Sequence, residues 1–358
     1  MKKTARIAAL TCAAALTLAA CGSKPAEEEG SDDPTNAETT STTEESPAVD
    51  EIDFKACMVS DSGGFDDKSF NQTSHDGLKA AAADLGVQTG EVESQSDSEY
   101  ADNIKALVSE GCNSITTVGF LLGDATEAAA KKNKKVNFSI VDFAYEKAPK
   151  NLKGLVFNTA EPSFLAGYVA AAKSESGTVG TFGGMNIPTV TSFMTGFKQG
   201  VDYYNSEEGG EVKVLGWNGK KGTFTDDFED KAKGQTVAEQ MIAQGADVIF
   251  PVAGPAGLGG LQAAQDADVK GIWVDTDGCK SAAEYCDVLL TSVMKGMDVA
   301  VEEAIKEGVE GTFTNELYVG TLENGGVGLA PLSDDAADLQ DKIDEITQKI
   351  IDGEITTG

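Results

Sequence analysis

Short apolar and β-branched runs alternate with longer Ala- and Lys-rich segments along most of the chain. The runs read FKACMV, NSITTV, VNFSIVD, GLVFN, GTVGTF, EVKVLGW, ADVIFPV and GIWVD, at residues 54–59, 113–118, 136–142, 154–158, 177–182, 211–217, 246–252 and 271–275. This alternating pattern predicts strands separated by helices, as in α/β proteins. Because the runs are continuously apolar, we expect parallel sheets covered by helices on both faces.

The first 21 residues follow a different pattern. A basic start is followed by an apolar stretch that is too short to cross a bilayer, and small residues precede Cys21. This order predicts an export signal and not a transmembrane helix. The ending Leu18-Ala19-Ala20-Cys21 resembles a bacterial lipobox, which predicts a lipid anchor on Cys21; ordinary cleaved secretion is the alternative.

Residues 22–50 contain almost no large apolar side chain and a large excess of Asp and Glu. Such a segment cannot bury enough surface to offset its ordering entropy, so we expect a disordered acidic tether. The residues after it suffice for two modest lobes or one large domain.

The charge of the chain limits its partners. The formal net charge is −31, and no arginine follows Arg6. Nucleic acid and anionic lipid surfaces need a basic partner, so both are disfavoured. Without arginine the mature chain also lacks the planar group that binds carboxylates and phosphates in bidentate fashion. We therefore expect a ligand that is not anionic.

Four cysteines remain beyond Cys21, and they fall into two plausible pairs. Cys279 and Cys286 would close a short loop, whereas Cys57 and Cys112 lie in or just before runs that could be neighbouring strands. Outside the cytosol these pairs predict two disulfides, with buried free thiols as the alternative. No cysteine or histidine spacing predicts a metal site.

Residues that could contact a ligand follow the predicted strands. They are Asp61 with Gly63-Gly64, Gly119 with Phe120, Asp142, the predicted loop AGPAGLGG at 253–260, and Asp275 with Asp277. In parallel sheets ligands bind beyond the carboxyl ends of the strands, so these residues should converge at one edge. Carboxylates, aromatic faces and glycine turns together favour a neutral, hydroxyl-rich ligand with a flat ring.

Each of these residues also has a purely structural interpretation. Asp61 could cap a helix, Phe70 could belong to the core, and the glycines of AGPAGLGG could form a strand-to-helix turn. That glycine spacing differs from GxGxxG and comes late in the chain, so no nucleotide cofactor, and indeed no cofactor of any kind, is predicted.

Several longer motifs resemble one family. SDSGGFDDKSFNQTSHDGLK resembles the opening motif of the basic membrane protein family, bacterial lipoproteins similar to the purine nucleoside receptor of ABC transporters. Further matches follow in the family's order and extend over the whole chain past the tether. They are AEPSFLAGYVAA, VGTFGGMNIPTVTSFMTGFKQGVDYYN, GTFTDDFEDKAKG, VAGPAGLGG, WVDTDGC and LTSVMKGMDVAV.

The resemblance implies a type I periplasmic-binding-protein fold, with two Rossmann-like α/β lobes that three crossovers join and that close on a ligand. The implied lobes are residues 51–160 with 291–316, and residues 161–290 with 317–358.

The resemblance also implies a ligand site. Asp61 and Asp142 would contact a base, and Phe70 would stack on it. Asp275 and Lys295 would contact ribose hydroxyls, and Gly254 would contribute a backbone contact. Further candidates are Ser62, Asn71, Phe120 and, as a second stacking ring, Phe224. The chain departs from the family at Asp277-Gly278-Cys279 and Lys295-Gly296, where the family often has V-D-x-D-Q and T-S-x-x-K-R.

These observations predict a monomeric lipoprotein on the outer face of the cell membrane that binds a nucleoside and delivers it to an ABC permease. A receptor that presents its ligand for signalling and a receptor for another neutral solute such as a sugar are the alternatives. An exported hydrolase is disfavoured, because the sequence has one histidine and no GxSxG motif.

Overall fold

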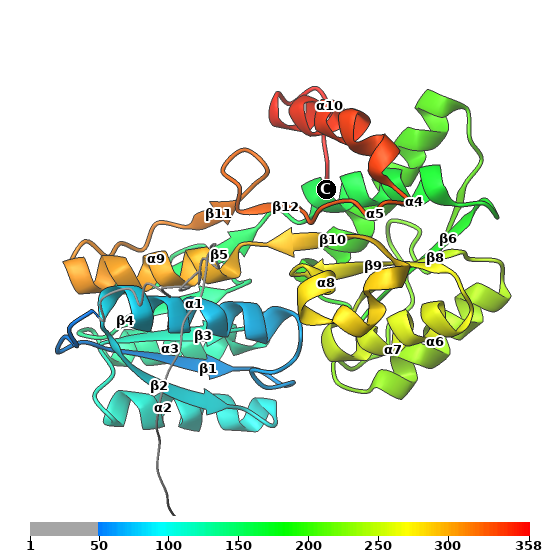
Figure 1. Ribbon diagram of the computed structural model, residues 1–358. Helices are drawn as coiled ribbons and strands as arrows, with labels where there is room; N and C mark the ends of the chain where they lie inside the picture. The colour runs from blue at the N-terminus through cyan, green and yellow to red at the C-terminus, as the bar shows by residue number, and fades with distance from the viewer. Residues whose placement is uncertain (1–48) are drawn as a thin grey trace, which may run out of the picture. The chain divides into compact units, whose positions relative to one another are not determined.

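Two six-stranded sheets organise residues 49–358, the part of the chain that this computed structural model describes (Figure 1). The predicted export signal, the lipidation site Cys21 and all but the end of the predicted tether lie outside the described residues. Between residues 49 and 358, no helix combines the length and apolar character that a membrane span needs.

The first sheet has the strand order β11-β5-β4-β3-β1-β2, and all of its strands are parallel. Its strands are β1 (Lys55–Ser60), β2 (Gln88–Glu93), β3 (Ser114–Val118), β4 (Asn137–Val141), β5 (Leu152–Phe157) and β11 (Tyr318–Gly320). The helices of this lobe are α1 (Phe70–Leu85), α2 (Tyr100–Ser109), α3 (Gly123–Lys132) and α9 (Met297–Glu310), with short 3₁₀ turns η1 (Asp97–Glu99) and η2 (Phe120–Leu122).

The second sheet repeats this order as β12-β10-β9-β8-β6-β7, with only β12 antiparallel to its neighbour. Its strands are β6 (Thr178–Gly183), β7 (Lys213–Leu215), β8 (Val248–Val252), β9 (Lys270–Asp275), β10 (Leu289–Lys295) and β12 (Val327–Leu329). The helices of this lobe are α4 (Ala160–Lys173), α5 (Pro188–Glu208), α6 (Lys231–Ala243), α7 (Gly254–Asp266), α8 (Gly278–Ser281) and α10 (Gln340–Ile351), with 3₁₀ turns η3 (Ala283–Val288) and η4 (Ala337–Leu339).

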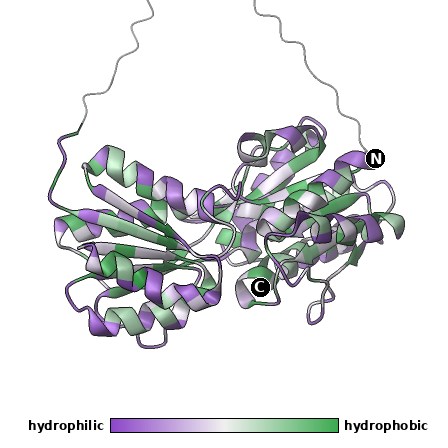
Figure 2. Ribbon diagram, turned by 90° about the horizontal axis from the view of Figure 1, so that it is seen from below, coloured by the Kyte–Doolittle hydropathy of each residue, from purple (hydrophilic) through white to green (hydrophobic). Residues whose placement is uncertain are grey.

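Helices cover both faces of each sheet, as the continuously apolar strands predict. In the first lobe, α1 and α9 pack on one face and α2 and α3 on the other. In the second lobe, α4, α5 and α10 cover one face and α6 and α7 the opposite face. Figure 2 shows hydrophobic residues concentrated on the strands, with hydrophilic residues on the outer sides of the helices.

The chain passes between the sheets three times, after β5, after β10 and after β11. Strand pairing shifts two of the lobe boundaries expected from the sequence. Residues 291–295 belong to β10 of the second sheet and not to the first lobe, and β11 pairs with β5 of the first sheet and not with the second lobe. The crossovers therefore begin where each strand ends, at residues 295 and 320.

Candidate ligand-binding site

The carboxyl ends of the strands in both sheets border one cavity, which has a free volume of about 80 Å³. A cavity at this edge of parallel sheets is where a ligand is expected to bind. The residues predicted to bind a ligand line this cavity, with the exception of Phe224. The expectation that strand-end residues converge at one place is thus confirmed for most of the set.

Asp61 follows β1 and reaches the cavity beside the end of β3. Its backbone N–H donates to the carbonyl of Val118, and its Oδ1 accepts a hydrogen bond of 3.1 Å from Nδ2 of Asn71. Gly119 makes room for this carboxyl group, since a Cβ there would lie 2.1 Å from Oδ2 of Asp61. Burial raises the pKa of Asp61 to about 8; Asn71 opposes the shift, and the carboxylates of Asp67 and Asp142 add to it.

Asp67 holds the first turn of α1 in place. Its carboxylate accepts hydrogen bonds of 2.9 Å from the backbone N–H groups of Ser69, Asn71 and Gln72, which would otherwise lack a partner at a helix N-terminus. Burial nevertheless raises the pKa of Asp67 to about 6. Asp67 is not among the predicted site residues, although an Asp just before a predicted helix is the usual signal for such a cap.

Asp142 and Asp275 occupy equivalent places in the two lobes, since β4 and β9 each stand third in their sheets. Asp142 follows β4 and Asp275 ends β9, and both have left-handed backbone, with φ of 67° and 69°. Asp tolerates this conformation better than most residues, and such backbone is common at functional sites. Ser69 donates to Oδ2 of Asp275 at 2.7 Å, and burial raises the pKa of Asp275 while Lys295 and Ser69 oppose the shift.

Lys295 is the one cationic side chain lining the cavity among residues 49–358, and it is 2% exposed. Its Nζ lies 2.7 Å from Oδ2 of Asp142 and 3.8 Å from Oδ1 of Asp275. The ammonium also lies over three rings, 4.6 Å from the centroid of Phe70, 5.3 Å from that of Phe157 and 5.8 Å from that of Phe193. Two carboxylates and three aromatic faces therefore satisfy this buried charge.

Aromatic rings from both lobes line the cavity. Phe70 and Phe120 come from the first lobe, and Phe193 and Phe228 from the second. Phe70 is the first residue of α1, and it also packs against the core cluster of the first lobe. The two interpretations of Phe70, a ring at the site or a core residue, thus describe two sides of the same side chain.

Phe224, predicted as a second stacking ring, does not line the cavity. Phe224 packs at the rim of the second core, in a T-shaped contact with Trp217 at a centroid distance of 6.3 Å. Phe228, four residues later, faces the cavity in its place. Gly184 leaves space for Phe228, since a Cβ there would meet the ring at 2.3 Å.

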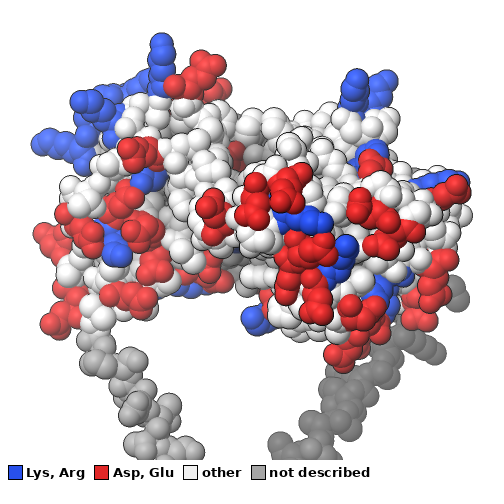
Figure 3. Space-filling view, turned by 90° about the horizontal axis from the view of Figure 1, so that it is seen from above, with Lys and Arg blue, Asp and Glu red and all other residues white. Residues whose placement is uncertain are grey.

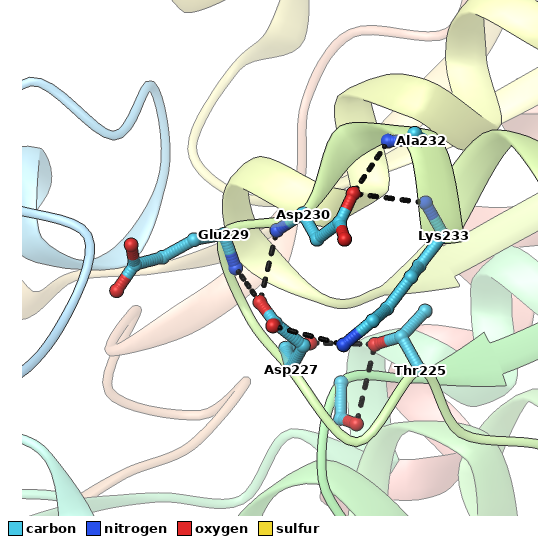
Figure 4. A network of polar contacts seen from close by, with 7 residues as sticks. Thr225, Asp227, Glu229, Asp230, Ala232 and Lys233 are labelled. Atoms are coloured by element: carbon cyan, nitrogen blue, oxygen red, sulfur yellow. Dashed lines mark hydrogen bonds and ion pairs between the residues drawn. The ribbon is translucent and has the colours of Figure 1, made fainter.

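A network of polar contacts fixes the loop that carries Phe228 (Figure 4). Asp227 accepts from the backbone N–H groups of Glu229 and Asp230 at 2.6 and 2.9 Å and from Nζ of Lys233 at 3.1 Å. Asp230 in turn caps α6 by accepting from the backbone N–H groups of Ala232 and Lys233. The backbone N–H groups of Asp230 and Glu229 lower the pKa of Asp227, so the loop is held by an ionised carboxylate.

AGPAGLGG is not a loop. Helix α7 begins at Gly254, and the later glycines of this stretch lie inside it. They allow close packing: a Cβ at Gly259 would lie 1.9 Å from the carbonyl oxygen of Lys231, at the start of α6. Gly254 alone has positive φ, 52°, and lines the cavity. The later glycines therefore serve helix packing and not the strand-to-helix turn expected of them, while Gly254 lies at the cavity as predicted.

Both predicted disulfides are present. Cys57 of β1 is bonded to Cys112, which precedes β3, and Cys279 of α8 is bonded to Cys286 of η3. None of these cysteines lines the cavity. They stabilise the lobes and take no part in the site.

The two lobes, the crossovers and the cavity at the strand ends define a type I solute-binding protein. Residues 54–358 match the family described as ABC transporter substrate-binding protein PnrA-like, and the chain belongs to this family. Its members are substrate-binding proteins of ABC transporters and not enzymes.

Named relatives and solved structures agree with this assignment. The chain is 30% identical to an ABC transporter nucleoside-binding protein of Lactococcus lactis subsp. cremoris, over 85% of this chain and 89% of that protein. It is also 30% identical to basic membrane protein D of Borreliella burgdorferi, over 81% and 84% of the two chains. A solute-binding protein of an ABC transporter from Aeropyrum pernix K1 superposes with a TM-score of 0.76 at 28% identity, covering 85% of this chain and 92% of that one.

Proposed function

We propose that this chain is a lipid-anchored, extracytoplasmic receptor that binds a purine nucleoside between its lobes and delivers it to an ABC permease. The observation that carries the proposal is the cavity itself, where strand-end carboxylates stand beside phenylalanine rings from both lobes. Phenylalanine rings bind a planar base by stacking, and carboxylates accept hydrogen bonds from ring N–H and ribose hydroxyl groups.

We propose roles for individual residues that line the cavity. Asp61 and Asp142, with Asn71 and Ser62 beside Asp61, face the base, and Phe70 and Phe228 stack on it from the two lobes. Asp275 and Lys295 bind the ribose, and the backbone at Gly254 completes this side. The name of the Lactococcus lactis relative, a nucleoside-binding protein, supports the same ligand class.

Charge argues against nucleotides as ligands. The single lysine of the cavity is already engaged by Asp142 and Asp275, so a phosphate would find no free cation there. The face of the molecule in Figure 3 likewise carries more acidic than basic side chains. A nucleoside should bind far more tightly than its 5′-monophosphate.

A panel of nucleosides, their 5′-monophosphates, free bases, sugars and amino acids tests the proposal by thermal shift and calorimetry. At a concentration of 100 Kd a true ligand stabilises the fold by about 2.7 kcal/mol. We expect this response from purine nucleosides alone. Equal affinity for a nucleoside and its monophosphate, or a response only to sugars, would overturn the assignment of the ligand.

The anchor has a separate test. Cells that express the full chain are fed a clickable fatty acid, and the label on the wild type is compared with that on Cys21→Ala. We expect the wild type to carry the label in the membrane fraction and the variant to lack it. Label on both proteins, or on neither, would contradict a lipid anchor at Cys21.

A further inference from the structure

The cavity holds more carboxyl groups than cations. Four aspartates line it, Asp61, Asp67, Asp142 and Asp275, together with Lys295. Lys295 lies within 4 Å of Asp142 and Asp275, and Asp67 is satisfied by three backbone N–H groups. Asp61 has one amide donor, Asn71, and no cation within salt-bridge distance in the described part of the chain.

Asn71 favours the anion of Asp61 through its hydrogen bond, but the charged groups around Asp61 oppose it. Asp67 precedes α1 and Asp142 follows β4, and both carboxylates repel a charge on Asp61. Tyr100 of α2 faces it too, and its own pKa is raised by burial and by Asp61. Glu93, at the end of β2, adds a further negative charge beside Gly64. Lys295, which β10 places in the cavity, is paired with Asp142 and Asp275 and not with Asp61. Burial therefore raises the pKa of Asp61 to about 8.

The two forms of this carboxyl group recognise different partners. An ionised carboxylate has two acceptors, whereas a neutral carboxyl group offers one donor beside one acceptor. The guanine edge with N1–H and the 2-amino group presents two donors and matches the ionised form. The adenine edge with N1 and the 6-amino group presents an acceptor beside a donor and matches the neutral form.

We propose that Asp61 selects among purine nucleosides through its proton: guanosine binds with release of that proton to solvent, whereas adenosine binds to the protonated carboxyl group. The inference rests on the proposed function, in which a purine base lies against Asp61. It assigns to Asp61 a specificity that depends on pH, in addition to a contact with the ligand.

Calorimetry on the wild-type protein tests this directly. Guanosine and adenosine are titrated at pH 6.5 in two buffers of different ionisation enthalpy, which gives the number of protons released. We expect about one proton for guanosine and none for adenosine. Between pH 6 and 7 guanosine affinity should rise about tenfold, because each pH unit below the pKa changes the ionised fraction tenfold. Adenosine affinity should stay level there and fall above pH 8.

Two variants identify the group that loses the proton. Asp61→Asn keeps one donor and one acceptor at every pH, so the ratio of guanosine to adenosine affinity, measured at pH 8.5, should fall at least tenfold, and proton release should vanish. In the matched variant Asp142→Asn, both affinities change but proton release with guanosine persists. Proton release on guanosine binding that persists in Asp61→Asn and is lost in Asp142→Asn would overturn the inference.

The outcomes separate the inference from the proposed function. If neither nucleoside binds, the proposed function fails. If both bind with equal proton counts at every pH, the nucleoside receptor stands and the role of the Asp61 proton is refuted.

Discussion

At the scale of single residues, Lys295 decides how charge is distributed in the site. It is buried, and Asp142 and Asp275 have no other cation within 4 Å among residues 49–358. Removing one partner of a buried ion pair costs about 3–5 kcal/mol, because the remaining charge stays without compensation. Lys295 also joins the lobes, since it extends from β10 of the second sheet to Asp142 at the end of β4.

Lys295→Met should therefore lower the free energy of unfolding by several kcal/mol in the absence of ligand, measured by urea denaturation. Lys198→Ala is a matched control, because its i,i+4 pair with Asp202 is solvent-accessible and should contribute no more than about 0.5 kcal/mol. The double variant Lys295→Met/Asp142→Asn should regain part of the loss. Equal costs for the Lys295 and Lys198 substitutions would show that the buried cation has no special role.

The aromatic residues allow a comparison within one loop. Phe228→Ala removes a ring that lines the cavity and should weaken nucleoside binding by about 1–3 kcal/mol, as should Phe70→Ala. Phe224→Ala removes a ring that packs on Trp217 and should lower the unfolding midpoint while changing the affinity little. Calorimetry and thermal unfolding of the three variants test this. A larger loss of affinity in Phe224→Ala than in Phe228→Ala would return the stacking role to Phe224.

Much of the cavity lining can be predicted from the sequence, because its residues follow apolar strands whose carboxyl ends meet. Asp61, Asp142 and Asp275 are found this way. Phe228 is not, since its position depends on the network around Asp227 and on the space that Gly184 leaves, and both are properties of tertiary packing. Asp67 is missed for a different reason: it lies in the connection between β1 and α1 and does not directly follow a strand.

At the scale of secondary-structure elements, the two disulfides join segments at very different separations. Cys57–Cys112 links residues 55 positions apart across β1 and β3, whereas Cys279–Cys286 spans 7 positions within α8 and η3. A crosslink stabilises a fold more when it closes a longer loop of the unfolded chain. The Cys57–Cys112 bridge should therefore contribute more to the free energy of unfolding.

Replacing Cys57 and Cys112 by Ala should cost about 4 kcal/mol in the free energy of unfolding, and replacing Cys279 and Cys286 about 2 kcal/mol, by the loop-entropy relation. Denaturant unfolding of both double variants measures the difference. Nucleoside affinity should change little in either, because neither bridge lines the cavity. A greater cost for the short bridge would mean that strain or local structure, and not loop length, sets the contribution.

Some strands and one helix could not be predicted from the sequence, and each has a physical reason. The edge strand β2 reads QTGEVE, pairs only with β1 and is largely exposed, so it lacks the apolar run that marks the central strands. The strands β11 and β12 have three residues each, too short for a periodic signal. The glycines of α7 reduce helix propensity, but close packing against α6 compensates.

At the scale of the whole molecule, polar contacts join the lobes across the cavity. Besides Lys295 and Asp142, the hydroxyl of Ser69 donates to Asp275, and Nε1 of Trp273 donates to the backbone carbonyl of Lys68 at 3.2 Å. Opening the lobes by a hinge motion would break such contacts, and a ligand that touches both lobes would favour closure. The carboxyl groups at the junction of the lobes are buried in Asp67, Asp142 and Asp275 and half-buried in Asp61, so their protonation bears on the stability of the whole protein.

This burial predicts an unusual dependence of stability on pH. The pKa of Asp61 is raised from 3.8 to about 8 and that of Asp67 to about 6. Between pH 4 and 8 the folded chain therefore binds more protons than the unfolded chain, and the free energy of unfolding without ligand should fall as the pH rises. Each group contributes less than about 1.4 kcal/mol per pH unit, since Asp61 keeps access to water in the cavity.

Urea denaturation of the ligand-free protein from pH 5 to 8.5 measures this slope. The exposed carboxylates of Asp335, Asp338 and Glu345 have lowered pKa values because of their lysine partners, so their contribution is lost only below about pH 4, outside this range. Asp61→Asn removes one titrating group and should flatten the slope between pH 6 and 8, where Asp67 is already ionised. Stability that rises with pH over this interval, or a slope that Asp61→Asn leaves unchanged, would show that Asp61 is ionised in the folded protein.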